Sequence, residues 1–250
     1  MKRLRRLTSV DYLNYISNKG ERVLNILCIA DEENKGLWDF FSPEKVKDVD
    51  LIISCGDLHS DYLQYLVTMA NKPLLYVRGN HDTKYDMNPP LGCEDIDDRI
   101  YDYKGLRILG LGGSMRYREG KDMYTEAEMA RRIRKLQSAI TLRNGFDILV
   151  THAPLKGYGD MEDLPHQGFE CLNKLVEKWK PKYVLHGHVH KSYSSGSFER
   201  ERIHSSGAKI INCYDKYELT VEEGEYPPMG KTGSALYDLY VSMKEHRRNE

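Results

Sequence analysis

The 250-residue sequence lacks the features that mark several classes of protein. No apolar run approaches the roughly 20 residues that a helix needs to span a bilayer, so we expect no membrane partner. The basic start of the chain, residues 1–6, is not followed by the apolar stretch of a secretory signal. The formal net charge is only −1, so the chain as a whole does not attract nucleic acid, although a local basic patch could still bind it.

Cysteine is scarce, and its pattern fits neither a disulfide framework nor a thiolate metal site. The five cysteines are odd in number and include no Cys-x-x-Cys pair. Cys28 and Cys55 lie in apolar, strand-like segments, where we expect them to fill the core. This usage is typical of proteins kept in a reducing compartment, so it predicts a cytoplasmic location.

Strand-like and helix-like segments alternate along the chain, which indicates an α/β protein. Strands are expected over residues 23–30, 51–55, 74–78, 99–103, 106–111, 147–151 and 182–186, and helices over residues 60–71, 125–143 and 168–179. After residue 197 we expect short β-rich pieces, including residues 209–213 and 235–241, with a loop over residues 222–234. The sequence therefore predicts a basic, helical extension over residues 1–22 and a single domain over residues 23–250.

Five of the strand-like segments are followed directly by Asp, Asn or His. These polar residues are, in chain order, Asp31 and Glu33, then Asp57, then Asn80, His81 and Asp82, then His152, and finally His188 and His190. In open α/β sheets the ligand crevice lies outside the carboxyl ends of the strands. A mixed set of oxygen and nitrogen ligands suits divalent ions such as Mn, Fe or Zn. The pattern therefore predicts a metal site at this edge.

The stretch Gly187-His188-Val189-His190 is the most specific of these motifs. Its period-two spacing after a strand points both imidazoles to the same side, and neutral imidazole is the commonest metal ligand. Gly187 allows the backbone to approach whatever the rings hold. The alternative, that each histidine is only half-buried or solvated, explains one such residue more easily than two.

Taken in order, the motifs resemble those of the calcineurin-like metallophosphoesterases, over about residues 24–190. The matching motifs are Asp31-x-Glu33, Gly56-Asp57, Gly79-Asn80-His81-Asp82, His152 and Gly187-His188-Val189-His190. The resemblance implies an α/β fold in which a two-sheet β-sandwich is flanked by helices, in four α/β/β/α layers. It also implies hydrolysis of phosphate esters by a hydroxide that bridges two divalent metal ions.

The same resemblance implies a role for each matching residue. One metal position would be held by Asp31, Asp57 and His190, with Glu33 as a further ligand, and the other by Asn80, His152 and His188, with Asp57 bridging both ions. His81 would donate a proton to the leaving group, and Asp82 would orient the His81 ring.

Glu33 departs from the family pattern, which usually has His at this position. If the Glu33 carboxylate binds metal, it favours harder ions such as Mn, Fe or Mg. If it instead turns to solvent, the first metal position binds weakly.

Two loops offer candidates for substrate binding. Arg116 or Arg118 could grip a phosphate group, and Tyr117 could stack on a base, although the same residues suit an ordinary surface turn. Residues 156–167 follow His152 and could form a rim or lid over the site.

The resemblance therefore implies a binuclear metal-dependent phosphoester hydrolase. The cysteine usage adds a cytoplasmic location, and Glu33 favours Mn among the possible metals. The expected substrate is a small phosphoester or nucleotide, with phosphodiesters preferred to phosphomonoesters. Glu33 motivates an alternative, in which the scaffold binds a nucleotide or a partner protein without turnover.

Overall fold

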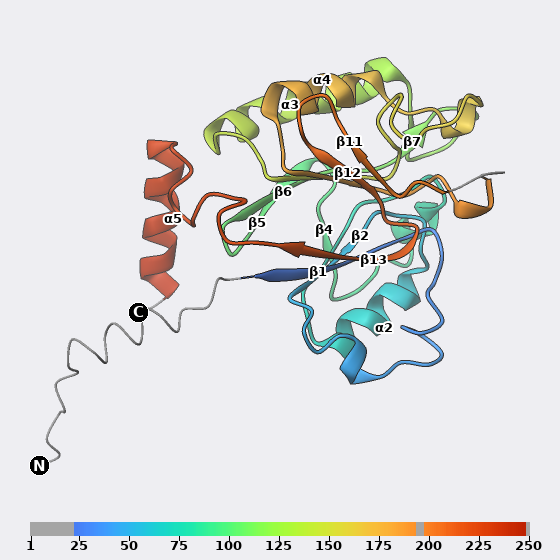
Figure 1. Ribbon diagram of the computed structural model, residues 1–250, viewed down its shortest axis with the longest axis horizontal. Coiled ribbons are helices and arrows are strands. Elements are labelled where there is room, and N and C mark those ends of the chain that lie inside the picture. The colour runs from blue at the N-terminus through green and yellow to red at the C-terminus, as the bar shows by residue number, and fades with distance from the viewer. Residues whose placement is uncertain (1–22, 194–197, 249–250) are drawn as a thin grey trace, which may run out of the picture.

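The computed structural model describes residues 23–193 and 198–248, so the extension expected over residues 1–22 lies outside the described residues. Two β-sheets pack face to face, and helices cover the outer face of each sheet (Figure 1). The resulting order of layers is helix, sheet, sheet, helix. This arrangement confirms the expected two-sheet sandwich flanked by helices.

The first sheet has the strand order β13-β1-β2-β3-β4. Its strands are β1 (Leu24–Ala30), β2 (Leu51–Ser54), β3 (Leu74–Tyr76), β4 (Glu94–Asp95) and β13 (Asp215–Val221). All pair in parallel except β13, which runs antiparallel to β1. Helix α2 (Ser60–Ala70) packs on the outer face through buried side chains such as Leu63 and Leu66.

The second sheet has the strand order β11-β12-β10-β9-β6-β5. Its strands are β5 (Arg99–Tyr103), β6 (Leu106–Leu111), β9 (Ile148–Thr151), β10 (Tyr183–His186), β11 (Glu201–Ile203) and β12 (Lys209–Asn212). The four inner strands are parallel, and the two edge strands are antiparallel to their neighbours. Helices α3 (Glu126–Leu142) and α4 (Glu170–Trp179) cover its outer face.

Short elements complete the described chain. They are the β-pair β7 (Ser114–Met115) and β8 (Met123–Tyr124), and the 3-10 turns η1 (Pro43–Lys45), η2 (Asp82–Asp86), η3 (Leu164–His166) and η4 (Lys191–Tyr193). No helix in the described ranges is both long and apolar enough to cross a membrane.

The main core lies between the two sheets because successive side chains of a strand point to opposite faces. In β1, Ile26, Cys28 and Ala30 are buried between the sheets, whereas Leu27 and Ile29 are buried on the α2 side. Both faces of this strand are therefore covered, as is usual for a parallel sheet with helices outside.

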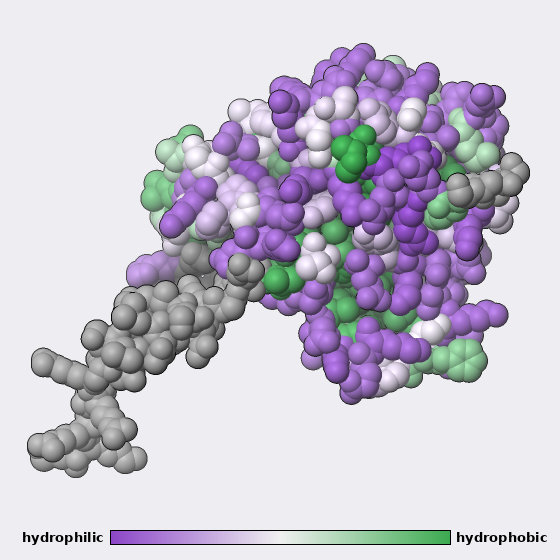
Figure 2. Space-filling view, viewed as in Figure 1, coloured by the Kyte–Doolittle hydropathy of each residue, from purple (hydrophilic) through white to green (hydrophobic). Residues whose placement is uncertain are grey.

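The C-terminal region corrects one expectation. Residues 235–241, expected as a β-rich piece, form the start of helix α5 (Ala235–Arg248). The helix starts there because Asp238 accepts hydrogen bonds from the Thr232 and Gly233 amides just before it, at 2.9 and 3.1 Å. Hydrophobic residues gather along α5 on an otherwise mostly hydrophilic face (Figure 2), and Leu236 is 74% exposed. The expected loop over residues 222–234 is confirmed, whereas the division into one domain stays a prediction.

Candidate metal centre

The predicted ligands lie on loops at one edge of the sandwich. Asp57 and Asn80 follow strands β2 and β3 of the first sheet, and His152 and His188 follow strands β9 and β10 of the second. Because these strands are parallel within their sheets, their carboxyl ends meet at the same edge. The site is therefore assembled from both sheets.

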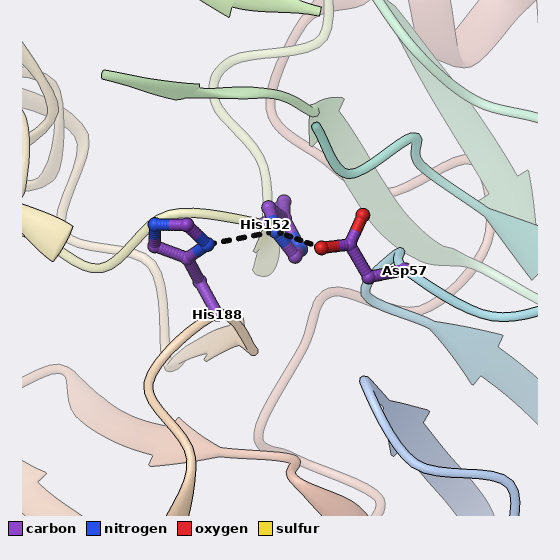
Figure 3. Close-up of side chains that lie close together, drawn as sticks. All are labelled: Asp57, His152 and His188. Atoms are coloured by element: carbon purple, nitrogen blue, oxygen red, sulfur yellow. Dashed lines mark hydrogen bonds and ion pairs between the residues drawn. The ribbon is translucent and has the colours of Figure 1, made fainter. Parts of the chain in front are cut away.

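The centre of the site is a close group formed by Asp57, His152 and His188 (Figure 3). Oδ2 of Asp57 lies 3.2 Å from Nε2 of His152, and Nδ1 of His188 lies 3.0 Å from the same nitrogen. Oδ1 of Asn80 is 3.2 Å from that nitrogen as well. Across the described ranges, this is the one group of three acidic, imidazole or thiol side chains with ligand atoms within 4.8 Å of one another.

Backbone carbonyls fix the tautomers of both histidines. Nδ1 of His152 lies 2.9 Å from the carbonyl oxygen of Cys55, and Nε2 of His188 lies 2.7 Å from that of Pro165. A carbonyl oxygen only accepts, so each of these ring nitrogens carries the proton and donates it. In the neutral rings the other nitrogens, Nε2 of His152 and Nδ1 of His188, then carry lone pairs that point into the site.

The donor set therefore fits a cation. The atoms that meet at this point are all hydrogen-bond acceptors when the imidazoles are neutral: two ring nitrogens, a carboxylate oxygen and an amide oxygen. Acceptors cannot pair with one another, so they need a proton or a metal ion between them. A divalent metal could be held by four residues, Asp57, Asn80, His152 and His188. Their mixed nitrogen and oxygen ligand atoms suit Mn, Fe or Zn.

The electrostatics of the group lead to the same conclusion. Burial opposes ionisation of Asp57, but the adjacent His152 more than offsets it and lowers the pKa of Asp57 to about 2. Burial likewise opposes a charge on His152, yet the Asp57 carboxylate raises its pKa to about 10. For His188, burial and the charge on His152 lower the pKa to about 3. The site thus favours one positive charge, carried either by a proton on His152 or by a metal ion.

The backbone around the site is strained or closely packed. Asp31, Asp57 and His188 all have left-handed φ values, of 66°, 58° and 70°. Such conformations persist where the surrounding structure enforces them, and they are concentrated at functional sites. A Cβ on Gly79 would lie 2.1 Å from Oδ1 of Asp57, so only glycine lets this loop pass the carboxylate.

Asp82 anchors the two loops of the first sheet to each other. Its buried Oδ2 accepts hydrogen bonds from the amides of Asp57 and Gly79, both at 2.8 Å. Burial and the nearby Asp57 carboxylate raise the pKa of Asp82 to about 7. The amide of His81 donates to Oδ1 of Asp57 at 2.8 Å, while His81 itself is exposed. The expected role of Asp82 in orienting the His81 ring stays a prediction.

The residues expected at the other metal position lie beside this group. Both carboxylate oxygens of the buried Asp31 side chain accept the amide of His188, at 3.0 and 2.9 Å. Nε2 of His190 lies 3.6 Å from Oδ1 of Asp31. Oε1 of Glu33 is buried and has no hydrogen-bond partner among the described residues. Asp31 and His190 are thus brought together, and the ligand role of Glu33 stays a prediction.

Aromatic rings around His190 and His188 were not anticipated. Tyr193 stacks on His190 with 4.7 Å between the ring centroids and an interplanar angle of 8°. The ring centroid of Tyr214 lies 5.1 Å from that of His190. His166, on η3, packs against His188 with 5.2 Å between the two ring centroids. His166 belongs to the loop over residues 156–167, which the sequence already placed beside the site because it follows His152. No motif marks either tyrosine.

The loop expected to bind substrate has partners within the protein. Arg116 forms an ion pair with Glu128 at 2.9 Å and donates to the carbonyl of Met123. The guanidinium of Arg118 lies 5.3 Å from the centre of the Tyr117 ring. These contacts account for the side chains as parts of a surface turn, and phosphate or base binding by them stays a prediction.

Comparisons with known proteins agree with this geometry. The model of the calcineurin-like phosphoesterase family matches residues 26–192. The UPF0046 protein K07C11.7 of Caenorhabditis elegans is 25% identical over 211 residues, which cover 74% of this chain and 70% of that protein. An uncharacterized protein of Haemophilus influenzae is 26% identical over 194 residues, covering 64% of this chain and 81% of that protein.

A solved structure, that of TT1561 of Thermus thermophilus, has the same fold. It superposes with a TM-score of 0.55 over 80% of this chain and 99% of that one, at 16% identity. The family match covers most of the described chain and includes every loop that carries the site. The chain therefore belongs to the calcineurin-like phosphoesterase family.

Proposed function

We propose that the protein is a binuclear metal-dependent phosphoester hydrolase that prefers phosphodiesters. One observation carries the proposal: two imidazoles with carbonyl-fixed tautomers direct their lone pairs at the same point as Asp57. Because the carbonyl oxygens fix the outer nitrogens, a cation that displaces the proton on Nε2 of His152 would meet two imidazole nitrogens and the Asp57 carboxylate together. Family membership adds the reaction class, since the family consists of phosphoesterases.

The residues divide into two groups of expected ligands. Asn80, His152 and His188 would hold one ion, Asp31 and His190 would hold the other, and Asp57 would bridge them. Bound divalent ions would offset the negative charge of the phosphate and lower the pKa of the attacking water.

Residues of this chain would perform the remaining tasks. His81 is exposed next to Asp57, where it could donate a proton to the leaving oxygen. The Asp82 carboxylate holds the Asp57 and Gly79 loops at a fixed separation. A positioned acid of this kind contributes about 10²–10⁴-fold, and the gain is largest when the leaving group is a poor one.

The test combines metal analysis with a panel of substrates. Purified protein is assayed with Mn²⁺, Fe²⁺ or Zn²⁺ on bis(p-nitrophenyl) phosphate and p-nitrophenyl phosphate, with and without chelator. We expect chelator-sensitive hydrolysis that is faster on the diester and is lost in His152→Ala. His204→Gln is the matched control because His204 precedes β12, at the opposite edge of the sheet. A protein that binds two metal ions but cleaves neither ester would refute the proposal.

His81→Ala tests the assignment of the acid. We expect this variant to keep its metal content and to lose most turnover on an alkyl ester, with a smaller loss on a nitrophenyl ester. Full activity on the alkyl ester would remove His81 from the reaction.

A second candidate function rests on Glu33. A buried carboxylate oxygen without a hydrogen-bond partner is what a displaced ligand would leave behind. In that case the scaffold would bind a nucleotide or a partner protein through one ion and would not turn over. The metal content and the ester hydrolysis of the wild type separate the two functions, because this one requires a single ion and no turnover. Glu33→Ala then tests the ligand role: a lost ion indicates ligation, and unchanged metal content removes Glu33 from the site.

A further inference from the structure

A pocket of about 220 Å³ adjoins the candidate metal centre on the side of the first sheet. Its walls come from the loop that leads from Asp57 into α2 and from the η2 turn that follows His81. We propose that this pocket receives the leaving group of the substrate, and that it selects a neutral alcohol carrying additional hydroxyl groups. The inference rests on the proposed function.

The position of Asp57 links the pocket to the metal centre. Its Oδ2 faces Nε2 of His152 at 3.2 Å, whereas its Oδ1 accepts the amide of His81 at 2.8 Å. The carboxylate thus separates the metal ligands from the side on which His81 and the pocket lie. A phosphoryl group at the metal centre would direct one ester substituent past His81 and into the pocket.

The size of the pocket limits the leaving group. A volume of about 220 Å³ corresponds to about seven water molecules at roughly 30 Å³ each. That space fits a three- to five-carbon polyol, such as glycerol or a pentose, while a larger leaving group would extend out of the open side of the pocket. The pocket is also smaller than the roughly 300–1,000 Å³ of sites that enclose drug-sized ligands.

Hydrogen-bonding side chains line one part of the pocket, beside the apolar side chain of Leu58 and the ring of Tyr85. Nδ2 of Asn88 donates to Oγ of Ser60 at 2.7 Å, and the same nitrogen lies 3.5 Å from Oδ1 of Asp61. The Asn88 amide group is therefore held in place, and its carbonyl oxygen remains able to accept. Asp61 offers a second acceptor and Lys84 a donor on the same walls. This polar part of the lining can bind hydroxyl groups, which a plain alkyl chain would leave without partners.

The charges of the pocket disfavour an anionic leaving group. Asp61 and Lys84 line it with one charge of each sign, while Asp57 is a proposed metal ligand and Asp82 is bound to two backbone amides. A carboxylate or phosphate on the leaving group would therefore meet the Asp61 carboxylate with no surplus of lysine or arginine side chains to bind it. An uncharged polyol meets hydrogen-bond partners without this repulsion.

The reaction is a hydrolysis. Water adds its oxygen to phosphorus, the ester P–O bond breaks, and the alcohol leaves with a proton that His81 donates. The products are the free polyol and the phosphomonoester of the retained group. Because an alkyl alcohol is a poor leaving group, this assignment also explains why an exposed histidine would be placed at the mouth of the pocket.

Matched diesters test the inference. The Mn²⁺-loaded protein is assayed on methyl 2,3-dihydroxypropyl phosphate, methyl propyl phosphate and methyl 2-carboxyethyl phosphate. We expect kcat/KM to be about tenfold higher for the dihydroxypropyl ester than for the propyl ester, the size of effect that one net hydrogen bond gives. The carboxyethyl ester should be the poorest substrate.

Variants connect the preference to the pocket. Asn88→Ala and Asp61→Ala should each lower the dihydroxypropyl-to-propyl ratio toward one, and either variant suffices if the other fails to fold. Thr68→Ala, at the far end of α2, is the control and should keep the wild-type ratio. Hydrolysis of the diesters with no preference, or with preference for the carboxyethyl ester, overturns the pocket assignment alone. If neither these diesters nor bis(p-nitrophenyl) phosphate is cleaved, the proposed function falls together with it.

Discussion

The proton on His152 should compete directly with metal ions, which makes metal affinity depend on pH in a defined way. The pKa of His152 is raised to about 10, because the Asp57 carboxylate more than offsets the cost of burying the charge. At pH 7 the metal-free site therefore carries a proton on the nitrogen that should bind the metal. Displacing it costs about 1.4 kcal/mol for each pH unit below the pKa, or about 4 kcal/mol at pH 7.

The expected result is an apparent affinity for Mn²⁺ that rises about tenfold per pH unit between pH 7.5 and 9. The rise should level off as the pH approaches 10. Calorimetric titration in two buffers of different ionisation enthalpy should show about one proton released by His152 per ion bound. His204→Gln should behave as the wild type does.

An affinity that stays constant from pH 7.5 to 9, without proton release, would refute this reasoning. It would mean that His152 is already neutral in the metal-free protein. The same pKa also sets a stability trend for the metal-free protein. Because the folded pKa lies above the ordinary value of 6.5, the His152–Asp57 pair stabilises the fold fully below pH 6.5, and this contribution is lost as the pH rises through about 10.

Substitutions at three positions separate the site from the fold. Gly79→Ala should abolish metal binding measured by calorimetry, since its Cβ would lie 2.1 Å from Oδ1 of Asp57; normal binding would show that the loop can move aside. Asp82→Ala should lower the free energy of unfolding by about 2–4 kcal/mol in urea titrations, because two amides lose their acceptor, and Asp82→Asn should recover part of it. Arg107→Ala breaks the buried 2.6 Å ion pair with Asp147 and should cost about 3–5 kcal/mol in the same titrations, while metal affinity of the folded protein stays unchanged.

The residue pattern alone predicted an α/β protein and the edge on which the site lies, whereas the order of the layers came from the family resemblance. Apolar runs such as residues 51–55 are short and strand-like, and each is followed at once by polar residues, so both the strand and its functional end are visible locally. Helix α3 was also predicted, over residues 125–143, and the structure shows that Thr125 and Glu128 form a capping box at its start.

The remaining features depend on contacts between distant parts of the chain. The tautomer of His188 is set by the Pro165 carbonyl, and that of His152 by Cys55, 97 positions away. No local pattern encodes either contact. Helix α5 was missed because its apolar residues also suit a strand, and the hydrogen bonds that start it come from the folded loop before it.

The Cys55–His152 hydrogen bond joins a loop of one sheet to a loop of the other. A cation bound between Asp57 and His152 would add a second link between the two sheets at the same end of the sandwich. Sliding of one half over the other would then require the ion to leave. The melting temperature would accordingly rise with the concentration of free metal. The supply of ions would then determine the lifetime of the folded protein as well as its activity.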